Sequence, residues 1–131
     1  HAWCFDFNYS DNDTKKALIE NTVFAYIRGN GTRFSDCYID TYQKGFQFGA
    51  GQYVVYITNL KWYVASNAWP TGLTAYVFPA SPAGKTMYKV FNADINGAGV
   101  TKFSDEDLSK QTNCRWYGIV HNLSDAPSTL Q

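Results

Sequence analysis

Apolar and polar residues follow two different periods along this chain. Over residues 14–28 the spacing is helical, since apolar side chains recur at i, i+4, i+7 and i+8, namely Ile19, Val23, Tyr26 and Ile27. Residues 10–13 (Ser-Asp-Asn-Asp) are types that cap helix N-termini, and residues 29–31 (Gly-Asn-Gly) supply a left-handed stop. The pattern therefore predicts one amphipathic helix over residues 14–28.

After residue 31 the period is two, which is typical of β-strands. It predicts strands over residues 34–42, 46–48, 52–57, 62–65, 73–78, 86–91, 100–103 and 113–120, with turns at 49–51, 68–72, 79–84 and 96–99. No internal repeat is visible. One helix followed by an antiparallel sheet that curls around it predicts an α+β fold. The length of 131 residues predicts a single domain, with its core at about 3–120 and a polar tail at 121–131.

Composition limits the function classes. Lys plus Arg and Asp plus Glu are both 11, so the net charge is zero, which disfavours tight sequence-independent binding to nucleic acid. No apolar run reaches the roughly 18–20 residues of a membrane span, so we expect no membrane contact and a monomer. Because the chain begins at His1 rather than Met, we expect a mature secreted protein. Aromatic residues make up 18%, which suits sheet packing and leaves room for an exposed aromatic binding face.

Three cysteines are present, and two of them lie near the ends of the chain. A disulfide between Cys4 and Cys114 would close a loop of about 110 residues, for which the chain-entropy model gives roughly 4–5 kcal/mol of stabilisation. Cys37 is left over, and we expect it to be a buried free thiol. Four Asn-x-Ser/Thr sequons, at Asn8, Asn12, Asn30 and Asn122, fit a secretory route.

Residues that carry acid–base or metal chemistry do not cluster in the sequence. The chain has two His and two Glu, at positions 1, 121, 20 and 106. His1 could bind copper only with His121 as a second ligand, and the acidic residues 105–107 lack the spacing of a calcium loop. We therefore expect no metal and no cofactor.

Several short strings occur in the order seen in one family. Residues 42–48 (Tyr-Gln-Lys-Gly-Phe-Gln-Phe) and 76–79 (Tyr-Val-Phe-Pro) are two of them; the others are 81–84 (Ser-Pro-Ala-Gly), 90–92 (Val-Phe-Asn), 98–101 (Ala-Gly-Val-Thr) and 113–114 (Asn-Cys). With a cysteine near each end and one helix before the sheet, the chain from Trp3 to Cys114 resembles the small guanyl-specific fungal ribonucleases. The resemblance implies their fold, with a terminal disulfide.

The catalytic positions of that family are replaced here. The resemblance places its Glu on Val77 (or, in another register, on Val54), its Arg on Tyr88, its catalytic His on Phe103 and its first His near Tyr38. RNA cleavage needs a base, an acid and a cation for the phosphorane. The replacements imply a pseudo-ribonuclease, with Tyr38, Val77, Tyr88 and Phe103 as an apolar contact cleft.

A ribonuclease scaffold without catalytic residues resembles the RNase-like effectors of powdery mildew fungi, the RNase-like proteins associated with haustoria. This resemblance implies secretion and translocation into the host cell cytoplasm. It also implies binding to host plant proteins and recognition as an avirulence factor by an intracellular immune receptor. The alternatives are an RNA-binding module, an active secreted ribonuclease, and a glycan binder that uses Trp62 or Trp69.

Overall fold

The computed structural model describes residues 2–3, 10–49, 53–64, 69–78, 87–97, 100–102, 114–123 and 125. These residues form two parallel β-sheets and one short helix, α1 (Asn12–Ile19). The larger sheet has the order β1 (Ala2–Trp3), β3 (Thr32–Asp40), β5 (Val54–Val64), β7 (Met87–Gly97) and β9 (Cys114–His121). The smaller sheet has the order β2 (Val23–Ile27), β4 (Lys44–Phe48), β6 (Ala75–Tyr76) and β8 (Val100–Lys102).

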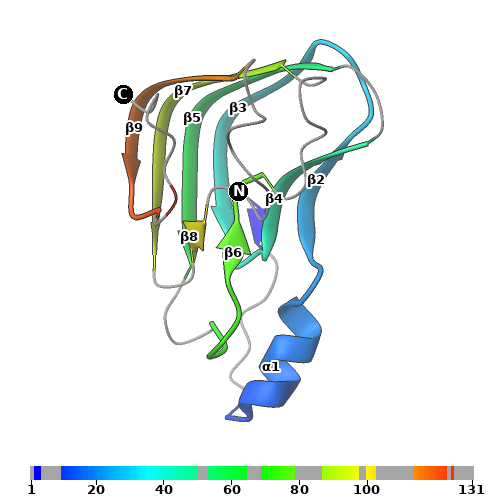
Figure 1. Cartoon of the computed structure of the whole chain (residues 1–131), viewed down its shortest axis with the longest axis vertical. Helices are drawn as coiled ribbons and strands as arrows, with labels where there is room; N and C mark the ends of the chain where they lie inside the picture. Colours follow the sequence, from blue (N-terminus) through cyan, green and yellow to red (C-terminus); the bar gives the residue numbers. More distant parts are fainter. Residues whose placement is uncertain are drawn as a thin grey trace.

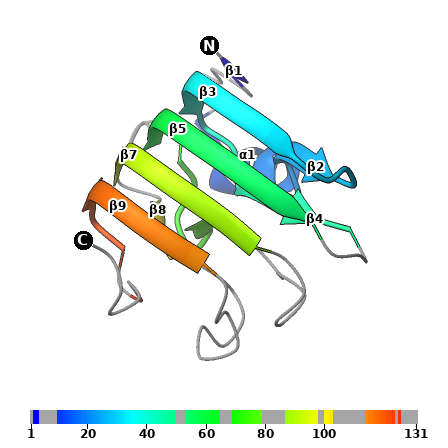
Figure 2. The same ribbon diagram turned by 90° about the horizontal axis from the view of Figure 1, so that it is seen from above.

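The chain winds as a solenoid. From β2 onward successive strands alternate between the two sheets, and each strand lies parallel to the strand one turn earlier. In the larger sheet Thr32 pairs with Val55, Val55 with Tyr88, and Tyr88 with Cys114, so that one turn takes 23, 33 or 26 residues. Seen from above, β3, β5, β7 and β9 lie side by side (Figure 2). Each turn therefore contacts mainly its two neighbours.

The strands of the larger sheet bend at one column of residues. Asp36, Asn59, Asn92 and Gly118 occupy equivalent positions on β3, β5, β7 and β9, and all have φ between 53° and 65°. Asn, Asp and Gly tolerate this left-handed backbone better than other residues. The chain follows the upper side of the molecule before the bend and turns down one side after it (Figure 1). We call residues 32–35, 54–58, 87–91 and 114–117 the upper limb, and residues 37–40, 60–64, 93–97 and 119–121 the lower limb.

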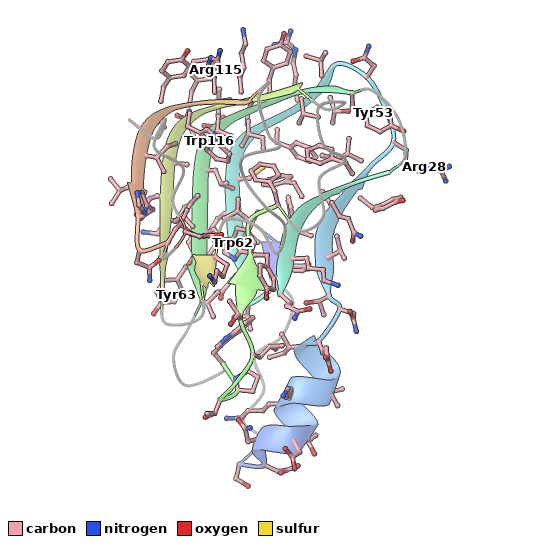
Figure 3. The ribbon with its side chains drawn as sticks, in the orientation of Figure 1. Arg28, Tyr53, Trp62, Tyr63, Arg115 and Trp116 are labelled. Atoms are coloured by element: carbon pink, nitrogen blue, oxygen red, sulfur yellow. The ribbon has the colours of Figure 1, made fainter. Side chains whose placement is uncertain are left out.

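The core lies between the two limbs and the smaller sheet. Val55 and Ile57 of the upper limb of β5 are buried, and so are Leu60, Trp62 and Val64 of its lower limb, because the left-handed residue resets the alternation. Phe46, Phe48 and Phe78 stack on the opposite side. The ring of Phe78 meets Trp116 edge-on. Trp62 and Trp116 both point into the interior (Figure 3).

The predicted helix over residues 14–28 is wrong in its second half. The helix ends at Ile19, Asn21 takes φ 68°, and Val23–Ile27 is strand β2, parallel to β4. Ile19 and Ile27 are buried as predicted, but Tyr26 is 57% exposed. The segment contains β-branched and aromatic residues, which suit a strand, and their helical spacing arose from two separate elements. The predicted cap is present, because Asp11 accepts hydrogen bonds from the backbone N–H groups of Asp13 and Thr14.

The prediction of a curled antiparallel sheet, and with it the ribonuclease-like α+β fold, is also wrong. All strand pairs of the described residues are parallel. The predicted strand positions overlap β3 to β9, and the predicted strands 52–57 and 62–65 are two ends of the single bent strand β5. A period of two reports which side chains face inward, but it is the same for both strand directions. No helix in the described part of the chain is long and apolar enough to cross a membrane.

Candidate ligand-binding face

The four positions proposed as a degenerate ribonuclease cleft lie on different parts of the chain, and the structure describes the side chains of only two of them, Tyr38 and Val77. Val77 is completely buried, and its backbone carbonyl accepts from the Phe46 N–H at 2.9 Å. Tyr38 is half-buried on the lower limb of β3, where it pairs with Lys61. Tyr88 is the second residue of β7, where it pairs with Val55. Phe103 lies outside the described residues. The proposed contact cleft therefore stays a prediction.

The predicted disulfide involves Cys4, which lies outside the described residues. Its neighbour Trp3 ends β1, and Cys114 begins β9, so these two residues belong to opposite edge strands of the larger sheet. Cys37 is a free thiol that packs against the core, but it is half-buried rather than buried as expected.

The other residues considered for chemistry are dispersed. His121 ends β9 with its side chain exposed, and its Nδ1 accepts from the Leu123 N–H at 3.2 Å. Trp62 is fully buried, and Trp69 packs against the core while its indole N–H donates to the Leu73 carbonyl at 2.6 Å. Trp62 therefore cannot stack on a glycan, whereas Trp69 is half-buried and the glycan alternative stays a prediction for it. Within the described residues, no three His, Cys, Asp or Glu side chains gather as metal ligands would. His1 and residues 105–107 lie outside the described part.

The outer side of the upper limb carries cations at equivalent positions. Arg33, Tyr56, Lys89 and Arg115 pair in register across β3, β5, β7 and β9, and we call them the basic row. Arg33 and Arg115 are exposed, Tyr56 lies between the buried Val55 and Ile57, and Lys89 precedes the buried Val90, so alternation directs the row outward. Arg115 points away from the molecule at the top, whereas the adjacent Trp116 points inward (Figure 3). The guanidinium carbon of Arg33 lies 4.7 Å from the centroid of the Tyr56 ring, which holds this cation against the face.

A second row lies two residues further along each strand. Ser35, Thr58, Phe91 and Tyr117 pair in register, and we call them the aromatic row. The rings of Phe91 and Tyr117 are stacked, with centroids 5.1 Å apart and planes at 13°. Phe91 is 38% exposed and Tyr117 is 40% exposed, so a ligand can reach both rings. On the other side of Phe91 the row continues with the short side chains of Thr58 and Ser35. The Thr58 hydroxyl donates a hydrogen bond to the Ser35 hydroxyl at 3.2 Å.

Carboxylates are absent from the described outward positions of this face. Among the upper-limb side chains that the structure describes, the outward ones are the two rows and Val54. Asp36 follows the aromatic-row residue Ser35 at the bend, where it accepts a hydrogen bond from Asn59. Asp40 and Asp94 lie on the lower limb, where Asp94 forms an ion pair with Lys61 at 3.4 Å. Asp11, Asp13 and Glu20 lie on or beside α1. Among the residues that the structure describes, this face therefore carries cations and no carboxylate.

The sequence contained a signal for this face that the prediction missed. Arg33, Tyr56, Lys89 and Arg115 each stand one residue before or after an inward position of a predicted strand. Their alignment becomes visible only with the parallel register, because antiparallel pairing would place them at different heights of the sheet.

The fold and the face together define a two-sheet parallel β-solenoid with one flat outer face bearing a basic row and an aromatic row. No family model, curated protein or solved structure matches the chain.

Proposed function

We propose that this protein is a binding module that holds an extended polyanion on the outer face of its upper limb. The observation that carries the proposal is the in-register alignment of Arg33, Lys89 and Arg115 on a face whose described outward positions hold no carboxylate. Aligned cations concentrate positive potential along a line, which attracts a chain of negative charges more strongly than scattered cations do.

The fold supports this role through its rigidity. Each strand of the face is hydrogen-bonded to its neighbours over most of its upper limb. The inward positions of the same strands, such as Val55, Ile57 and Val90, are fully buried in the core. Side chains on such a surface are held at fixed spacings of about 4.8 Å between neighbouring strands. Little ordering of the protein is then needed on binding.

The host-directed effector role rested on the resemblance to the ribonuclease scaffold. That scaffold has an antiparallel sheet, whereas this chain forms parallel sheets. Secretion, entry into a host cell and recognition by an immune receptor remain predictions from sequence resemblance. The binding face does not depend on them.

The test compares two double variants with equal loss of charge. Arg33→Ala/Lys89→Ala removes two cations from the face, while Lys16→Ala/Lys61→Ala removes two from α1 and the lower limb. Binding to a labelled sulfated glycan fragment and a labelled oligonucleotide is measured by fluorescence anisotropy over a range of salt concentrations. We expect the native chain to bind at least one probe at low salt. The face variant should bind at least about tenfold more weakly, with a log–log salt slope smaller by roughly 1.5–2.

The control double variant should keep native affinity and the native slope. Failure of the native chain to bind either probe, or an equal loss in both double variants, would overturn the proposal. Circular dichroism of each variant checks that the solenoid is retained.

A further inference from the structure

We infer that the polyanion suited to this face is a single-stranded nucleic acid, with its phosphates along the basic row and its bases against the aromatic row. This inference rests on the proposed function and adds the ligand class. It is carried by the geometry of two parallel rows with different chemistry, one cationic and one aromatic.

The first observation is the stacked pair of rings. Phe91 is 38% exposed and Tyr117 is 40% exposed, and their rings are nearly parallel, at 13°. Their centroid distance of 5.1 Å is close to the spacing of adjacent strands, so the two rings stand abreast on β7 and β9. Such rings accept any base by stacking, because every base has a π-face. A stack of two exposed rings can be extended by a base, particularly beside Phe91, where the next residues of the row are the short Thr58 and Ser35.

The second observation is the distance between the rows. Lys89 and Phe91 are two residues apart on β7, and Arg115 and Tyr117 are two apart on β9. Two residues of strand span about 6.6 Å. In a nucleotide the phosphate and the base are likewise separated by the width of a sugar. In an acidic glycan the carboxylate or sulfate is attached to the ring itself or to its first exocyclic carbon. Separate rows for charge and for rings therefore favour a nucleotide chain.

The third observation concerns the strandedness of the ligand. The face is an open sheet surface (Figure 2), and the rings of Phe91 and Tyr117 lie on its outside. The bases of a duplex are stacked on each other, so they cannot contact these rings. A single strand offers both its phosphates and its unpaired bases to one side. A basic track combined with stacking rings is the physical basis of single-strand binding in general. We therefore expect a single strand to bind more tightly than a duplex of the same sequence.

The experiment uses the full chain and an oligodeoxythymidylate of about 12 nucleotides with one 2-aminopurine, a length within the site sizes of single-strand binding folds. Anisotropy gives the affinity, and 2-aminopurine fluorescence reports stacking. Phe91→Ala removes the stacking ring, and Tyr63→Ala, an equally exposed aromatic on the lower limb (40%), is the matched control. We expect Phe91→Ala to weaken binding roughly fivefold to a hundredfold and to abolish the fluorescence change. Phe91→Trp should restore both.

The outcomes separate this inference from the proposed function. If a sulfated glycan binds through Arg33 and Lys89 while the oligonucleotide does not, the binding face stands and the ligand class assigned here is wrong. If the duplex binds as tightly as the single strand, or if Phe91→Ala and Tyr63→Ala behave alike, the base-stacking role is wrong. If neither probe binds, both proposals fail.

Discussion

The side-chain amide of Asn92 donates a hydrogen bond to Oδ1 of Asn59 at 2.8 Å, one turn of the solenoid away. Nδ2 of Asn59 in turn donates to Oδ1 of Asp36 at 2.9 Å. All three residues have a left-handed backbone and sit at the bend between the two limbs. The result is a ladder of amides along the corner of the solenoid, which connects neighbouring turns through side chains in addition to the backbone pairing. It holds the corner that separates the proposed binding face from the lower limb.

Removing the middle of this ladder should destabilise the fold. Asn59→Ala loses two side-chain hydrogen bonds. It also places Ala, which lacks the polar side chain that helps Asn to adopt this backbone, at φ 53°. We expect a loss of about 2 kcal/mol in the free energy of unfolding, measured by urea denaturation. Asn59→Gly loses the same bonds without the backbone strain and should cost about 1 kcal/mol. Equal stability of the Ala and native proteins would contradict the role of the ladder.

The column of left-handed residues continues beyond the ladder to Gly118, and we expect Asn to be accepted there. Gly118 has φ 65°, and an added Cβ would meet only the Cα and N of Asn92, both at an ordinary contact distance of 3.7 Å. Asn tolerates this backbone and could hydrogen-bond to Asn92. Gly118→Asn should therefore lie within about 0.5 kcal/mol of the native stability or above it. Gly118→Val, which is β-branched, should lose about 1–3 kcal/mol; thermal unfolding of the two variants gives the comparison.

Gly45 should not accept any side chain. A Cβ at this position would lie 2.4 Å from Cζ3 of Trp62 and 2.7 Å from the Val77 carbonyl oxygen. Trp62 is completely buried and has no space to move. We expect Gly45→Ala to lower the free energy of unfolding by about 3 kcal/mol or more. Gly29→Ala, where the nearest atom is Thr32 Oγ1 at 3.6 Å, is the control and should lie within about 1 kcal/mol of native.

The same clash predicts a rescue. Trp62→Phe removes the two indole carbons that the new Cβ would meet but leaves its close approach to the Val77 carbonyl oxygen. It also removes an indole N–H that is buried without a described partner. In the Gly45→Ala background we expect Trp62→Phe to recover part of the lost stability, so that the double variant is more stable than the sum of the single effects. Strict additivity in the double-mutant cycle would show that the two sites are not in contact.

Asp11 should give the start of α1 a pH dependence. The hydrogen bonds from Thr14, first from its hydroxyl and then from its backbone N–H, lower the pKa of this carboxyl below its ordinary value of 3.8. A group with a lowered folded pKa stabilises the fold above its unfolded pKa, and this contribution is lost as the pH falls through the folded pKa. We expect the Thr14 amide to titrate with a midpoint below 3.8 in NMR spectra. Asn caps equally well but does not titrate, so Asp11→Asn should abolish this step while α1 remains; a midpoint above 3.8 in the native chain would contradict the contact.

The cysteines provide a test of strand order. Trp3 lies in β1 and Cys114 in β9, with β3, β5 and β7 between them. Four strand spacings correspond to about 19 Å, whereas a disulfide requires Cα atoms within about 7 Å and Cys4 is one peptide, about 3.8 Å, from Trp3. We expect a non-reducing peptide map to show no bridge between Cys4 and Cys114. A quantitative bridge in the monomer would mean that β1 does not occupy its edge.

Local features of this protein could be predicted from the sequence. The cap at Asp11, the beginning of the helix and the positions of most strands follow from residue types and from alternation, as in β5, where Val55, Ile57 and Trp62 face inward. The strand formed by residues 23–27 could not be predicted in this way. Its apolar spacing fits a helix, and only pairing with β4 makes it a strand.

The proposed binding face could likewise be predicted only in part from the sequence. The cationic and aromatic residues are visible in the sequence, but they are separated by turns of 23, 33 and 26 residues, so no repeat shows that they align. The unequal turn lengths also hide the column Asp36, Asn59, Asn92 and Gly118, which repeats once in every turn of the structure.

By itself the sequence determined which segments are extended, which of their side chains are apolar enough to be buried, and that no catalytic or metal-binding cluster is encoded by local spacing. Only the tertiary structure decided that the strands are parallel, that the larger sheet bends at its left-handed residues, and that Arg33, Tyr56, Lys89 and Arg115 share one face. The physical reason is that alternation depends on the two sides of a single strand, whereas strand direction and register depend on contacts between residues more than twenty positions apart.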